Sequence, residues 1–64
     1  MYYNSIFRIR TMDLTIIRRV RQYCDCEGIP WAIIDDGKHP YEINFKTNRK
    51  TYLYILSCNG LREK

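Results

Sequence analysis

The most reactive candidate in this 64-residue sequence is its single histidine. His39 stands between Lys38 and Pro40, directly after the turn-forming stretch at 35–37. An exposed imidazole at such a place titrates near neutral pH and suits proton transfer to or from a ribose hydroxyl or a leaving oxygen. The neighbouring Lys38 would hold a phosphate or stabilise the charge that develops on it. The simpler interpretation, which spacing alone favours, is a surface histidine beside a turn.

The positive charges of the chain are clustered in a way that suits a polyanionic partner. Eleven Lys and Arg residues stand against seven Asp and Glu, which gives a formal net charge of +4. Such an excess favours anionic partners through long-range attraction and direct phosphate contacts. We expect a nucleic-acid-binding surface made of six basic residues: Arg18, Arg19, Lys38, Lys46, Arg49 and Lys50. For the arginines at 18 and 19, a solvated helix face is the competing interpretation.

Three cysteines raise the question of a metal site. Together with the histidine they would offer zinc three sulfurs and one nitrogen, from Cys24, Cys26, Cys58 and His39. Only one residue separates the first two cysteines, whereas the usual structural pair is separated by two or more. On a helix, that spacing also points the two side chains in roughly opposite directions. Free thiols are therefore the favoured interpretation, and we expect no metal and no cofactor.

Length and composition favour one small domain spanning residues 1–64, with its function on a surface rather than in a deep pocket. The odd number of cysteines and the lack of a signal peptide indicate a reducing compartment. No apolar run approaches the length of about 18 residues that a membrane helix needs. We expect a cytoplasmic protein of a bacterial host cell that has no contact with a membrane.

Residues 13–27 carry the clearest helical pattern. Asp13 or Thr11 can cap the amino end, and Gly28 can end the helix in a conformation with positive φ. Five residues with largely apolar side chains recur at helical spacing on one side: Ile16, Ile17, Val20, Tyr23 and Cys24. The helix is therefore predicted to be amphipathic.

Three short strands are predicted between residues 31 and 58. The stretch 31–34 is apolar, apolar and polar residues alternate over 41–46, and the stretch 52–56 is rich in strand-forming residues. The sequence thus predicts an α+β fold in which one amphipathic helix packs on a three-stranded antiparallel sheet. The second helix is expected to be missing or vestigial.

Residues 1–11 are expected to form an accessory segment, with Met12 as an alternative start of the chain. The predicted strand at 52–56 is apolar on both faces, and a single helix covers only one face of a sheet. The other face would be covered by residues 2–10, by a second copy of the chain or by a bound partner. Residues 2–10 could form a strand with Tyr3, Phe7 and Ile9 on one side. A homodimer is therefore among the expectations.

The order of these elements, with Gly37-Lys38-His39-Pro40 before the second strand, resembles the HicA-type toxins and small phage proteins of the same lineage. The likeness covers roughly residues 13–59. It implies a fold similar to double-stranded-RNA-binding domains, ribosome-independent cleavage of mRNA, and a cognate antitoxin as partner. It also implies that His39 is the catalytic residue and Gly37 the loop glycine. The sequence departs from the family where Lys38 replaces a small hydroxyl residue and where Pro40 follows the histidine.

We therefore expect a small RNA-binding protein of the HicA-like type, either a weak ribonuclease or a degenerate one. Its partners would be RNA or another nucleic acid, and an antitoxin. The alternative is a phage or prophage regulator that binds a host protein, for instance to disarm a defence system. Tyrosine and arginine also dominate protein interfaces, so composition does not separate the two functions.

Overall fold

The structure, a computed structural model, describes residues 4–37 and 40–62. In chain order it contains these strands and helices: β1 (Ser5–Thr11), α1 (Leu14–Glu27), β2 (Trp31–Ile34), β3 (Tyr41–Thr47) and α2 (Arg49–Cys58). The strands form one antiparallel sheet in the order β1-β3-β2. The predicted fold class, an α+β fold with a three-stranded antiparallel sheet, is confirmed.

Helix α1 begins and ends where the sequence predicts. Asp13 caps its amino end by accepting a hydrogen bond from the Thr15 amide at 2.9 Å. Gly28 follows its last turn with φ 69°, a conformation that a residue without a Cβ adopts at little cost. The predicted apolar side faces the sheet, with Ile17, Val20 and Cys24 buried and Ile16 and Tyr23 partly buried.

Strand β3 is the centre of the sheet and pairs with both neighbours. Its Ile43 lies opposite Ile9 of β1 on one side and Ile33 of β2 on the other. Because side chains alternate between the two faces of a strand, these residues share one face with Phe45. The strand predicted at 31–34 and the alternating strand that follows it are confirmed.

The prediction of a third strand at 52–56 is wrong, because this stretch lies inside α2. Asn48 caps the helix by accepting a hydrogen bond from the Thr51 amide at 2.8 Å. Ile55 and Leu56 are both buried. In a strand with one buried face this would not occur, because adjacent side chains point to opposite faces. The expectation of a missing or vestigial second helix is therefore also wrong.

Strand β1 supplies the third strand of the sheet. All seven of its residues are paired with β3, and Ile9 is only 4% exposed. The expectation that residues 1–11 are an accessory segment is wrong for Ser5–Thr11, because one side of this strand completes the core. The alternative of a strand within 2–10 holds for its described part, whereas Tyr3 lies outside the described residues.

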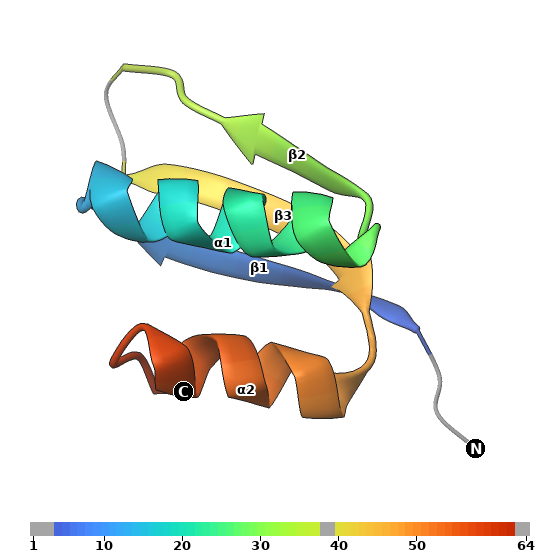
Figure 1. Cartoon of the computed structure of the whole chain (residues 1–64). Helices are drawn as coiled ribbons and strands as arrows, with labels where there is room; N and C mark the ends of the chain where they lie inside the picture. The colour runs from blue at the N-terminus through green and yellow to red at the C-terminus, as the bar shows by residue number, and fades with distance from the viewer. Residues whose placement is uncertain (1–3, 38–39, 63–64) are drawn as a thin grey trace.

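Both helices contact the same face of the sheet (Figure 1). Helix α1 crosses over β3 and β1, and α2 runs beside β1. Tyr52 of α2 stacks on Phe7 of β1 with ring centroids 4.3 Å apart, and Tyr54 of α2 lies 5.8 Å from Tyr23 of α1. Among the described residues, the resulting core contains eight buried apolar ones: Ile9, Ile17, Val20, Cys24, Ile43, Phe45, Ile55 and Leu56. No helix in the described part of the chain covers the other face of the sheet.

Candidate nucleic-acid interface

The sheet face that points away from α1 is the candidate site, and we call it the open face. It consists of every second residue of each strand: Ile6, Arg8, Arg10, Ala32, Ile34, Glu42, Asn44 and Lys46. Two of its apolar residues are well exposed, Ile6 at 73% and Ile34 at 51%. Three of the eight side chains are cationic and one is acidic, so the open face carries a net positive charge.

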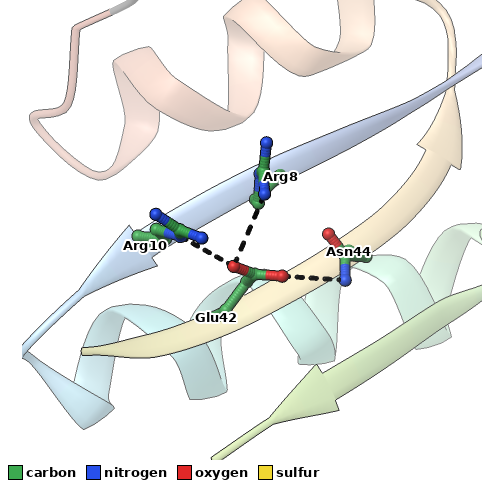
Figure 2. Close-up of polar contacts among 4 residues, drawn as sticks. All are labelled: Arg8, Arg10, Glu42 and Asn44. Carbon is green, nitrogen blue, oxygen red and sulfur yellow. Dashed lines mark hydrogen bonds and ion pairs between the residues drawn. The ribbon is translucent and has the colours of Figure 1, made fainter. Parts of the chain in front are cut away.

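Glu42 lies at the centre of the open face, beside two arginines of the neighbouring strand (Figure 2). Its Oε1 accepts a hydrogen bond from Arg10 Nε at 2.7 Å and lies 3.9 Å from Arg8 Nη1. Its Oε2 accepts a hydrogen bond from Asn44 Nδ2 at 3.1 Å. The register brings these groups together, because Arg10 is directly opposite Glu42 and Arg8 is the diagonal neighbour on the same face.

The two guanidinium groups remain open to solvent although they contact Glu42. The side chains of Arg8 and Arg10 are 58% and 63% exposed, whereas that of Glu42 is 13% exposed. One carboxylate has two oxygens, and each guanidinium has five N–H donors in a fixed fork. Donors therefore remain on both guanidinium groups: Arg10 donates one hydrogen bond to the carboxylate, and Arg8 lies only at ion-pair distance from it.

These contacts shift the ionisation of Glu42. The pKa of the Glu42 carboxyl is lowered, mainly by the hydrogen bond from Arg10. Burial of the carboxyl raises this pKa, whereas the hydrogen bond from Asn44 and the charge of Arg8 lower it further. The folded-state pKa therefore lies below the unfolded-state value. Ionised Glu42 stabilises the fold above the unfolded-state pKa, and this contribution is lost as the pH falls through the folded-state pKa.

Glu42→Gln is expected to lower the free energy of unfolding at about pH 7, and the difference from the wild type should shrink as the pH falls toward about 3. Urea unfolding of the wild type and the variant at the two pH values measures this. At neutral pH, a double-mutant cycle with Arg10→Ala should show that the two side chains are coupled. An equal loss at both pH values would mean that the charge of the carboxylate does not stabilise the fold.

The nucleic-acid-binding residues predicted from the sequence do not share one surface. Lys46 lies on the open face. Arg18 and Arg19 are exposed on α1, which covers the opposite face of the sheet. Arg49 and Lys50 lie in the first turn of α2, soon after the end of β3. The structure thus brings Lys46 together with the two arginines of β1 and separates it from the arginines of α1.

Lys38 and His39, the predicted phosphate-binding and catalytic residues, lie outside the described residues. The turn before them is described. The Gly37 amide donates a hydrogen bond to Asp35 Oδ1 at 2.9 Å, and Gly37 has φ 75°. In the described part of the turn predicted at 35–37, a glycine thus stands where the backbone has a positive φ.

Arg8, Arg10, Glu42 and Asn44 were not singled out by their residue types or spacing. A signal was present, because two arginines and no acidic residue precede Met12. The arginines alternate with apolar residues, as in a strand that has one face in water. A cross-strand cluster further requires the pairing register, which a strand's own sequence does not contain.

The cysteines do not form a metal centre in the described part of the chain. Cys24 is fully buried in the core, and this burial raises the pKa of its thiol, whereas Cys26 and Cys58 are exposed. A cysteine binds a metal ion as the thiolate, and burial disfavours this charged form, so Cys24 is a poor candidate for a metal ligand. Within residues 4–37 and 40–62, no three His, Cys, Asp or Glu residues come together in a way that could hold a metal ion. His39 lies outside these ranges.

Comparison with known proteins finds no match: no family model, no curated protein and no solved structure matches the chain significantly. The resemblance to HicA-type toxins therefore stays a prediction from the sequence. Of the two described helices, neither is long and apolar enough to cross a membrane. The function of the open face has to be inferred from its own geometry and charge.

Proposed function

We propose that this protein binds RNA through the phosphates of its backbone and that the open face is the binding surface. The observation that carries the proposal is the pair of exposed guanidinium groups, Arg8 and Arg10, which lie on the same face of β1 within ion-pair distance of Glu42. The planar fork of a guanidinium matches two oxygens of a phosphate. Lys46 adds a third positive charge on the same face.

The spacing and chemistry of the face favour contacts to the backbone over contacts to bases. Arg8 and Arg10 are two residues apart on one strand, which separates their Cα atoms by about 7 Å and lets each side chain reach a different phosphate. None of the eight open-face residues is aromatic, whereas proteins that hold single strands by their bases stack these on aromatic rings. We therefore expect binding that depends little on RNA sequence.

The experiment is a titration of a fluorescently labelled oligouridylate with the protein, followed by anisotropy between about 50 mM and about 200 mM salt. Each phosphate contact to a single strand contributes about −0.7 to the slope of log affinity against log salt, so three contacts give a slope of about −2. An oligonucleotide of equal length and mixed sequence should bind with similar affinity. Absence of binding, or affinity that does not change with salt, would contradict the proposal.

Cleavage of the bound RNA is the part of the proposal that rests on His39 and the resemblance alone. His39 would move the proton at the scissile ribose-phosphate, with Lys38 near the phosphate. A degenerate ribonuclease would keep the binding and lack the cleavage. Incubation of a structured RNA with the wild type and with His39→Ala separates the two, because equal cleavage by both proteins would remove His39 from any catalytic role.

A protein partner, including a second copy of the chain, is the second candidate, and strand β2 favours it. This edge strand is apolar and exposed, with Trp31 at 36%, Ile33 at 39% and Ile34 at 51%. An exposed apolar edge strand is a template for pairing with another strand. Light scattering tests self-association, and a monomer at all accessible concentrations would argue against a homodimer.

A further inference from the structure

The outer edge of β1 carries backbone groups that point away from the rest of the sheet. The Lys46 amide donates to the Pro30 carbonyl, so the backbone groups of Lys46 point toward β2. These directions alternate along an antiparallel strand, and Ile6 of β1 lies opposite Lys46. The N–H and C=O groups of Ile6, Arg8 and Arg10 therefore point away from β3, toward the edge of β1 that no strand pairs within residues 4–37 and 40–62.

A groove with a volume of about 530 Å³ runs along this edge, between β1 and α2. Helix α2 stands beside β1 rather than beneath the middle of the sheet (Figures 1 and 2). Tyr52, Leu56 and Leu61 line the groove on its α2 side. A further strand next to β1 would therefore lie over these apolar side chains, as β1 itself lies over the core.

The charge of the groove limits what such a strand can be. Three arginines, Arg8, Arg10 and Arg62, line it, and none of its described lining residues is acidic. A second copy of β1 would bring arginines beside arginines, and like charges on neighbouring strands are destabilising. A strand with acidic side chains would instead meet guanidinium groups that Glu42 neutralises only in part.

We propose that the β1 edge and the adjoining groove bind an extended segment of a protein partner in which acidic and apolar side chains alternate. Its backbone pairs with the free edge of β1 and adds a fourth strand to the sheet. Its acidic side chains lie beside Arg8 and Arg10 on the open face. Its apolar side chains point the other way and cover the partly exposed Tyr52 and Leu61 in the groove.

This inference goes beyond RNA binding and does not require it. If both hold, the segment uses the same two guanidinium groups as the phosphates. An acidic strand at the β1 edge would then compete with RNA, and a partner that carries one would regulate access to the open face. Because the first test contains no RNA, failure of one proposal leaves the other intact.

The test is the binding of a short, labelled, blocked peptide in which Glu and Val alternate, measured by fluorescence anisotropy with the full chain. A peptide of the same composition with its Glu and Val residues in two blocks is the matched control. The alternating peptide should bind at least about fivefold more tightly, because only an alternating strand satisfies both the arginines and the groove. Equal binding of the two peptides would mean attraction by charge alone and would overturn the proposal, as would the absence of binding.

Backbone pairing is tested from both sides. Arg8→Pro removes the charge and the outward N–H, whereas Arg8→Ala removes only the charge. The proline variant should bind the alternating peptide about fivefold more weakly than the alanine variant, the size of one hydrogen bond. N-methylation of the peptide at the residues whose N–H groups would donate to β1 removes backbone hydrogen bonds between the peptide and β1 without changing the protein. Backbone pairing can therefore be tested even if Arg8→Pro does not fold. Unchanged affinity of the N-methylated peptide would exclude strand addition.

Discussion

A chain that begins at Met12 is expected to show no cooperative unfolding transition. The deletion removes β1, which is one of three strands and the only described partner of β3 on that side. It also removes Ile9 from the core and Phe7 from its stack on Tyr52, one of the contacts that join α2 to the sheet. The remaining hairpin of β2 and β3 is marginal by itself. A domain of this size has a free energy of unfolding of only about 3–10 kcal/mol, which such a loss exceeds.

Circular dichroism during urea unfolding measures this, and a matched pair of point variants controls for it. Ile9→Ala should cost about 2–5 kcal/mol, because it leaves a cavity at a residue that is 4% exposed. Ile6→Ala makes the same chemical change three residues away, where the side chain is 73% exposed, and should stay within about 0.5 kcal/mol. Equal effects of the two variants, or an unaltered transition in the shortened chain, would place β1 outside the fold.

Helix α1 and the strands at 31–34 and 41–47 were predictable because local signals agree with tertiary structure there. Asp13 and Gly28 mark the ends of the helix, and the apolar period of 3.6 residues marks its buried side. In the second of these strands, alternation over Tyr41, Ile43 and Phe45 corresponds to the covered face. Helix α1 and strand β3 thus contain in their own sequences the information about which side is buried, whereas all four residues of β2 are apolar and exposed.

Helix α2 was not predictable in the same way because propensity and context disagree. The stretch 52–56 contains two tyrosines and an isoleucine, which favour strands. In the structure, β1 already occupies the third position of the sheet, and the stretch covers the core as a helix with Tyr52, Ile55 and Leu56 inward. The signals that could have revealed it are the capping residue Asn48 and Gly60 with φ 68° after the last turn.

The residues of the open face were likewise only partly predictable from the sequence. The basic residues Arg18, Arg19 and Lys46 could be recognised from charge alone, but charge does not say which of them share a surface. The cluster around Glu42 exists only because residues 32 positions apart in the chain, Arg10 and Glu42, are opposite each other in the register. Pairing between distant strands is set by the whole fold rather than by either strand.

The double variant Arg8→Ala/Arg10→Ala is expected to lower RNA affinity at least about a hundredfold, because a hydrogen bond to a charged group contributes about 1.5–3 kcal/mol and two such groups are lost. The slope of log affinity against log salt should fall by about 1.4, or about 0.7 for each phosphate contact. Loss of the two arginines also leaves the negative charge of Glu42 on the face without its partners. Anisotropy titrations across the salt range give both quantities.

The matched control is Arg18→Ala/Arg19→Ala, which changes the net charge by the same amount on the exposed side of α1. If the open face is the binding surface, this variant should keep most of the affinity and nearly all of the salt slope. Circular dichroism of both variants should show the wild-type fold, since all four side chains are exposed. Equal losses in the two variants would mean that RNA responds to net charge and not to a particular face.

The most direct measurement of the central claim is the titration of the ¹⁵N-labelled protein with an oligouridylate, followed by amide and arginine side-chain NMR signals. Binding at the open face predicts that the signals of Arg8, Arg10 and Asn44 shift together, with those of Lys46, while the signals of α1 stay in place. Shifts concentrated on Arg18 and Arg19, with the β1 and β3 signals unmoved, would contradict the proposal that the open face binds RNA.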